Sequence, residues 1–169
     1  MIPMKISQKG LYALQAMMRL ARRYNEGAIR IRDIAYDEGL PEKFLELILL
    51  EMKNARMVES VRGAKGGYRL RRPPTEIYLA EIIRLMDGAL APFGDAEQLR
   101  ELIEKDVEHR ALYQVFLDVR DAAARILERT TLADIIRDDS TKPGKKRREK
   151  KADPARVLSM VATGRQDKK

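Results

Sequence analysis

The segment VRGAKGGYRL, residues 61–70, is the most informative part of the sequence. Alternating residues on both sides of a glycine-rich centre predict two short strands joined as a hairpin. The hairpin tip carries Arg62 and Lys65, and its glycines let the backbone approach a partner closely. Such a tip suits the minor groove of DNA, where negative potential is focused, although a solvated tip is the alternative. A nucleotide-binding loop is not indicated, because that loop requires Lys followed by Ser or Thr.

The residues before this hairpin have the pattern of a helix-turn-helix. Two helices are predicted, over residues 32–38 and 41–55. The motif needs a small residue where its helices cross, a residue that tolerates positive φ in the turn, and apolar residues that seat the second helix. These residues are, in order, Ala35, Gly39, Leu45 and Ile48. The Ala-to-Gly spacing alone is a weak signal, but together with the hairpin it predicts a winged helix-turn-helix.

Other elements follow from the spacing of apolar residues. A first helix is expected over 7–24, capped by Ser7, and a short strand over 29–31. Beyond the hairpin we expect a helix over 79–87, an irregular stretch, and one or two helices within 99–129. The inward stripe of the first helix is predicted to be Leu11, Leu14, Met18 and Ala21. The methionines at helical spacing are interpreted as core residues, with an effector pocket as the alternative: Met17, Met18, Met52, Met57 and Met86.

The last long helical stretch carries an apolar seam. Its residues recur at spacings of four and three, as in helices that pack against a partner helix. An amphipathic helix with such a seam needs a second helix to cover it. The predicted dimer interface therefore comprises Leu112, Phe116, Val119, Ala123 and Ile126.

Charge is distributed in three blocks. Residues 1–75 carry 15 Lys and Arg against 8 Asp and Glu, residues 76–141 carry 8 against 15, and residues 142–169 carry 11 against 3. The basic first block indicates an anionic partner such as nucleic acid. The final block has few apolar residues, so we expect a disordered basic tail from residue 138 onward. Such a tail either solubilises the chain or extends its contact with DNA.

The residue inventory excludes several classes of function. The chain has no Cys and a single His, so disulfides, thiolate metal sites and thiol nucleophiles are excluded. No constellation of carboxylates stands out, and we expect neither an enzyme nor a bound cofactor. No apolar run approaches the roughly 18 residues of a membrane span, and the first residues lack a signal-peptide core. A soluble cytoplasmic protein is therefore expected.

In a winged helix-turn-helix, the second helix of the motif lies in the major groove. Lys43, Glu46 and Leu47 are predicted to face base edges, although Glu46 could instead pair with a neighbouring Lys. Phosphate contacts, which supply affinity rather than sequence choice, are assigned to Lys9, Lys53, Arg69 and Arg71. The complete predicted DNA-binding set is Ser7, Lys9, Lys43, Phe44, Glu46, Leu47, Lys53, Arg62, Gly63, Lys65, Gly66 and Arg69.

Four segments resemble the Rrf2 family of winged-helix regulators. They are KISQKGLYAL at 5–14, the hairpin at 61–70, IYLAEIIRLMDG at 77–88 and TTLADI at 130–135. The resemblance covers residues 4 to about 136, and RGAKGGYRL is highly specific. It implies a homodimer built on the long C-terminal helix, in which each winged helix reads one half of a near-palindromic operator. It also places Lys43 and Glu46 where the family's recognition helix touches bases, and Arg62 on the family's wing arginine.

The sequence departs from the family pattern at two places. Pro41 stands where relatives often have a capping Ser, so backbone geometry at Leu40 or water must cap the helix. Members that sense with an iron–sulfur cluster carry three cysteines before the dimer helix, whereas this chain has APFGDAEQ at 91–98. Without cysteine a thiolate-held cluster is chemically unavailable. His109 lies near a histidine ligand of some relatives; we interpret it as a surface or dimer-interface residue, with a remnant of a lost site as the alternative.

These observations predict a mainly α protein in three parts. A winged helix-turn-helix with a two-stranded wing occupies 1–88, a linker and dimerisation helix occupy 89–137, and a basic tail occupies 138–169. The predicted function is sequence-specific regulation of transcription, most simply repression, by a homodimer on double-stranded DNA. The signal is expected to be something other than a cluster, such as a small-molecule effector. The alternative, suggested by the CymR type, is a regulator that binds DNA only in complex with a metabolic enzyme.

Overall fold

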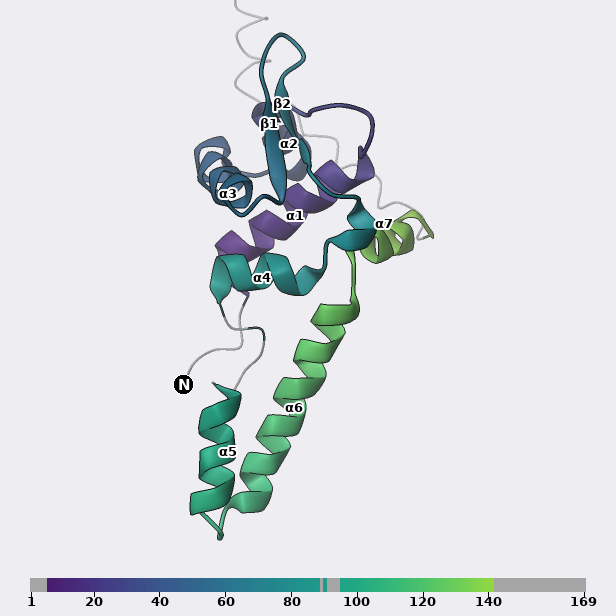
Figure 1. The fold of residues 1–169 in the computed structure, drawn as a ribbon. Coiled ribbons are helices and arrows are strands. Elements are labelled where there is room, and N and C mark those ends of the chain that lie inside the picture. Colours follow the sequence, from purple (N-terminus) through teal and green to yellow (C-terminus); the bar gives the residue numbers. More distant parts are fainter. Residues whose placement is uncertain (1–5, 89, 91–94, 142–169) are drawn as a thin grey trace, which may run out of the picture.

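The computed structural model describes residues 6–88, 90 and 95–141. A helical body carries the two-stranded wing, and the α5–α6 hairpin extends from the side of the body opposite the wing (Figure 1). The elements are α1 (Gln8–Arg22), α2 (Ile31–Glu38), α3 (Glu42–Asn54), β1 (Val58–Val61), β2 (Gly67–Leu70), the 3-10 helix η1 (Pro74–Glu76), α4 (Leu79–Asp87), α5 (Ala96–Lys105), α6 (Arg110–Arg129) and α7 (Leu132–Thr141). The predicted mainly α fold with a two-stranded wing is confirmed.

The wing is an antiparallel pair in which Val58 lies opposite Leu70 and Val61 lies opposite Gly67. The strand predicted at 29–31 is wrong, because only Ile29 pairs with the sheet. Ile29 exchanges two backbone hydrogen bonds with Tyr68, of 2.9 and 2.8 Å, as an isolated bridge. Ile31 already begins α2, so the helix takes the backbone groups that a longer strand would need.

The core surrounds α1, which contacts α2, α3, α4, α7 and β2. The predicted stripe of α1 is confirmed in part: Ala21 is buried and Leu14 and Met18 pack against the core, but Leu11 is 46% exposed. Ala13 and Met17, which lie outside that stripe, are fully buried. A helix covered by several neighbours carries small side chains at its closest contacts, and α1 presents Ala13 and Ala16 there. The apolar face predicted for α3 is confirmed, because Leu45, Ile48, Leu49 and Met52 are all buried.

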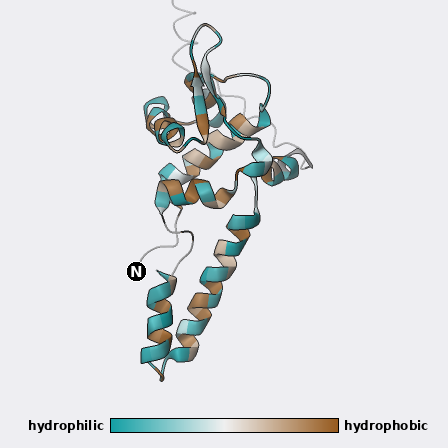
Figure 2. Cartoon of the chain, viewed as in Figure 1, coloured by the Kyte–Doolittle hydropathy of each residue, from teal (hydrophilic) through white to brown (hydrophobic). Residues whose placement is uncertain are grey.

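The stretch from 99 to 129 forms two helices, and the first begins slightly earlier than expected, at Ala96. The two helices pack through a small separate cluster in which Ala96, Leu99 and Leu117 are buried. Phe116, predicted as part of the dimer seam, is half-buried against this cluster instead of lying fully on the outer face. Apolar residues nonetheless recur along the length of α6 (Figure 2).

α7 was not predicted as a separate helix. α7 returns to the body and packs against α1 and η1, with Leu132 fully buried in the main core. Thr131 caps the helix: its hydroxyl oxygen accepts from the Asp134 N–H over 3.2 Å, and the Asp134 carboxylate accepts in return from the Thr131 backbone N–H over 3.0 Å. α7 extends to Thr141, past residue 138 where the tail was predicted to begin. The rest of the predicted tail, 142–169, lies outside the described residues.

Candidate nucleic-acid interface

The helix-turn-helix is formed by α2 and α3 as the sequence predicts. Gly39 ends α2 with φ of 69°, a left-handed conformation that glycine adopts without strain. The backbone N–H of Leu40 donates to the Ala35 carbonyl over 2.8 Å and closes the turn. Ala35 itself is 6% exposed, because the two helices cross beside it. This turn fixes how α3 is presented on the surface.

The outer face of α3 is open to solvent. Lys43, Glu46 and Lys53 are exposed, and Leu47 is 59% exposed. Among the described residues, the side chains of Lys43, Glu46 and Lys53 form no ion pair with one another, so the alternative of a paired Glu46 has no support. Pro41 occupies the N-cap of α3 without a side-chain hydrogen bond, and its carbonyl accepts from the Leu45 N–H. The expectation of a cap at Leu40 is therefore wrong by one residue.

The wing tip carries two exposed cations. Arg62 and Lys65 are exposed, and within the described part of the chain neither side chain has a hydrogen bond or ion pair. The Gly66 N–H donates to the Gly63 carbonyl over 2.9 Å and tightens the loop between the two cations. A short loop of small residues with two exposed cations is suited to a narrow groove of negative potential.

Four other predicted DNA contacts are already engaged within the protein. Lys9 pairs with Glu51 at 2.7 Å, and Arg69 pairs with Glu59 at 2.6 Å. Both pairs are partly exposed and therefore weak. The Ser7 hydroxyl caps α1 by accepting from the Gly10 N–H and donates to Asp87. Phe44 is half-buried and meets Tyr12 edge to face, with ring centroids 5.8 Å apart.

Sequence reasoning missed two residues that shape this surface. Asp87, at the end of α4, also accepts from the backbone N–H of Ser7 over 3.1 Å and so holds the start of α1. Arg30, immediately before α2, donates through Nη2 to the carbonyl oxygen of Ala64 in the wing tip over 2.7 Å. Neither contact has a sequence signature, because each joins residues far apart in the chain through a single polar group.

His109 lies at the N-terminus of α6, at the turn that joins α5 to α6. Its Nδ1 lies 2.9 Å from Oδ2 of Asp106, and the Tyr113 hydroxyl donates to the same carboxylate over 3.1 Å. The hydrogen bond from His109 lowers the pKa of Asp106, and the hydrogen bond to Asp106 raises the pKa of Tyr113. His109 is exposed at this end of the hairpin, far along the chain from α3 and the wing.

Replacing His109 tests this turn. In His109→Ala the pKa of Asp106 is expected to rise toward its ordinary value, because the largest lowering contact is lost. The folded-state pKa is depressed, so ionised Asp106 stabilises the turn above its ordinary pKa and this stabilisation is lost as the pH falls through the depressed value. An NMR titration of the Asp106 carboxyl carbon measures the shift, with Lys105→Ala as the control. An unchanged Asp106 pKa in His109→Ala would contradict the assignment.

The helix-turn-helix, the paired wing beside it and the basic tip together define a winged helix-turn-helix protein, a class built to bind DNA. A family model described as "Iron-dependent Transcriptional regulator", Rrf2, matches residues 6–138. The chain belongs to the Rrf2 family of transcriptional regulators. It is similar to the HTH-type transcriptional regulator CymR of Bacillus subtilis (strain 168), with 37% identity over 78% of this chain and 89% of the relative.

Two further comparisons agree with this membership. The HTH-type transcriptional regulator IscR of Aliivibrio salmonicida is 38% identical over 52% of each chain. The solved structure of CymR, described as the global cysteine regulator of B. subtilis, superimposes with a TM-score of 0.69 at 34% identity, covering 79% of this chain and 97% of that one. The family model and these relatives are regulators of transcription, and none of them is described as an enzyme.

The family description names iron, and the residues of this chain do not fit a thiolate-held iron–sulfur cluster. The sequence contains no Cys to supply a thiolate. Among the described residues, no group of three or more His, Asp or Glu side chains is placed to hold a metal ion. This chain is therefore a cysteine-free member of the family. In the part of the chain that the structure describes, no helix is both long and apolar enough to span a membrane.

Proposed function

We propose that this protein represses transcription by binding a near-palindromic operator as a homodimer. Each subunit places α3 in a major groove, where Lys43, Glu46 and Leu47 meet base edges, and inserts Arg62 and Lys65 of the wing into the adjacent minor groove. The observation that carries the proposal is the open face of α3 together with the two exposed wing cations, which have no hydrogen bond or ion pair among the described residues. Phosphates compete easily with the exposed ion pairs of Lys9 and Arg69.

The dimer is proposed to form through the outer face of α6. Four apolar side chains of α6 are exposed and recur at spacings of three, four and seven residues: Leu112 (49% exposed), Val115 (55%), Val119 (45%) and Ile126 (66%). They lie on one face of the helix, away from the cluster with which Phe116 and Leu117 contact α5. Burying this apolar stripe against a second copy would remove it from water. Ala123, also predicted for the seam, is half-buried beside the stripe.

In this proposal the chain has two functional units, and the first is formed by segments that are not contiguous in sequence. The DNA-reading unit comprises residues 6–88 together with α7, and the α5–α6 hairpin is the dimerisation arm. The signal is a ligand or partner other than a thiolate-held cluster. The arm lies apart from α3 and the wing (Figure 1).

Selection of bound sequences from a random DNA library by the purified protein tests the proposal. The expected product is an imperfect palindrome bound with an affinity that falls steeply as salt increases. If the pure protein has only weak, salt-sensitive affinity, and a metabolic enzyme that co-purifies from cells restores tight binding, the partner-dependent alternative replaces this one. If no sequence is enriched with or without such a partner, sequence-specific binding is wrong.

Arg62→Ala is expected to weaken binding to the selected operator by roughly 1 to 3 kcal/mol, because the wing arginine would lose a specific contact. Fluorescence anisotropy at fixed salt measures the change. Arg100→Ala is the matched control, since it removes the same charge from the exposed surface of α5. Equal affinities of Arg62→Ala and the unmodified protein would remove Arg62 from the interface.

A further inference from the structure

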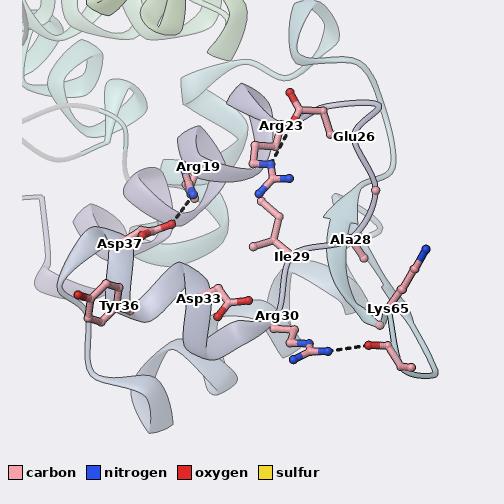
Figure 3. A pocket seen from close by; sticks show the side chains of 13 residues that line it. Arg19, Arg23, Glu26, Ala28, Ile29, Arg30, Asp33, Tyr36, Asp37 and Lys65 are labelled. Atoms are coloured by element: carbon pink, nitrogen blue, oxygen red, sulfur yellow. Dashed lines mark hydrogen bonds and ion pairs between the residues drawn. The ribbon is translucent and has the colours of Figure 1, made fainter.

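A groove separates the exposed side of α2 from the wing. It has a volume of about 510 Å3 and is lined by both signs of charge, including Arg19, Arg30, Asp33, Asp37 and Lys65. Arg19 pairs with Asp37 on one wall, and Figure 3 shows Arg30 reaching from the start of α2 toward the loop that carries Lys65. The side chain of Arg30 therefore connects the helix-turn-helix to the wing at the edge of this groove.

The contact that Arg30 makes is specific. Its Nη2 donates to the carbonyl oxygen of Ala64 over 2.7 Å, which is a short distance for a charged donor and a neutral acceptor. Within the described residues the Arg30 side chain has no carboxylate partner. The Arg30 guanidinium thus binds the backbone of the wing tip. In the neighbouring Arg32, Nε lies 3.8 Å from Oδ1 of Asp33, and among the described residues this side chain has no hydrogen bond to the wing.

The wing is held at two levels by consecutive residues. At the level of β2, the backbone of Ile29 exchanges two hydrogen bonds with Tyr68. At the tip, the side chain of Arg30 holds Ala64. Arg30 is also the N-cap residue of α2, and its carbonyl accepts from the N–H groups of Asp33 and Ile34. A displacement of the tip must therefore break the Arg30 hydrogen bond or disturb the start of α2.

The tip has little else to hold it. Gly63, Ala64 and Gly66 have no side chain that reaches the body, and the loop's own backbone hydrogen bond joins Gly66 to Gly63. A loop with so few contacts samples many conformations unless it is tied down. The two cations that flank Ala64 would then be presented in many orientations.

We propose that Arg30 is a positioning residue that fixes the wing tip relative to the helix-turn-helix. By holding the Ala64 carbonyl, it sets the direction in which Arg62 and Lys65 leave the tip, so that the wing is preorganised for the groove next to the one read by α3. This inference rests on the proposed function for its effect on DNA binding. Its structural part, the order of the tip, is independent of DNA.

The test combines a measurement without DNA and a measurement with it. In Arg30→Ala, 15N relaxation of the free protein is expected to show the amide order parameters of 63–66 falling from near 0.85 to below about 0.6, as in flexible loops. Arg32→Ala, which removes the adjacent arginine, is the matched control and leaves them unchanged. Operator affinity of Arg30→Ala is expected to fall about ten-fold, the size of one charge-assisted hydrogen bond.

A double-mutant cycle distinguishes positioning from direct contact. Since Arg30 acts through the tip, Arg30→Ala is expected to have little further effect in an Arg62→Ala, Lys65→Ala background and to leave the salt dependence of binding unchanged. Additive losses, with a fall of about 0.9 in the salt slope, would indicate a direct phosphate contact and overturn the proposal. Unchanged order parameters in Arg30→Ala would overturn it whether or not the protein binds an operator. Failure of the unmodified protein to bind any operator would instead refute the proposed function.

Discussion

Val119→Asp is expected to convert the proposed dimer into monomers and to weaken binding to the full operator by about 10²- to 10⁴-fold. Val119 lies in the middle of the exposed stripe of α6, between Val115 and Ile126. A carboxylate there would face its symmetry mate in an apolar seam, where an unpaired charge is strongly disfavoured. Each monomer would keep its own half-site contacts but lose the gain from binding two half-sites together.

Sedimentation equilibrium measures the oligomeric state of this variant, and anisotropy measures its affinity for the operator. Gln114→Asp is the matched control, because it adds the same carboxylate to the exposed polar side of α6, where Gln114 contacts Asp118. Circular dichroism establishes that both variants retain the helical fold. A dimeric Val119→Asp variant with full affinity would show that this face of α6 is not the dimer interface.

Gly67→Ala is expected to lower the free energy of unfolding by roughly 2 to 5 kcal/mol, through backbone strain and overpacking together. Gly67 has φ of 152°, and a Cβ built on it would overlap the carbonyl group of Ile29. That overlap is with backbone, so no side-chain rotation relieves it. The bridge between Ile29 and Tyr68 must open, and the wing then loses its attachment to the body.

Gly39→Ala provides the comparison for this variant. Gly39 also has positive φ, but a Cβ there meets nothing within 4 Å. Its replacement is expected to cost about 1 to 2 kcal/mol, the strain of a left-handed conformation alone. Urea unfolding measures both variants. If Gly67→Ala is no more destabilising than Gly39→Ala, the close approach of Ile29 to the wing does not constrain the fold.

The sequence predicted those parts of the fold that local patterns encode. The turn at Gly39, the apolar face of α3 and the wing hairpin each depend on residues close together in the chain, and all are confirmed. The stripe of α1 was predicted only in part: Ala21, Leu14 and Met18 do face the core, but crowding around α1 buries the smaller Ala13 and leaves Leu11 exposed. How crowded a helix is depends on tertiary contacts, which spacing alone does not reveal.

The residues of the candidate DNA interface were likewise predicted only where a local pattern encodes them. The exposed α3 residues and the wing cations were predicted from the positions that the motif gives them. The internal partners of Lys9 and Arg69, and the tie from Arg30 to Ala64, were not predicted. Each joins one polar group to another element, so it leaves no periodicity in the sequence. α7, Leu132–Thr141, was missed because it lies between the helical stretch predicted within 99–129 and the tail predicted from residue 138, and overlaps the start of that tail.

The return of α7 to the body has a mechanical consequence. The chain leaves the α5–α6 hairpin at Thr130, and this end is anchored: the Leu79 N–H donates to the Thr130 carbonyl and the Leu132 N–H donates to the Ile77 carbonyl, each over 2.9 Å. Before the hairpin, Asp87 at the end of α4 holds Ser7. α6 also contacts α4 directly, and both α4 and α7 contact α1. A rotation of the arm would therefore act on α1 at two places, and α1 in turn contacts α2, α3 and β2, the elements of the proposed DNA-reading surface.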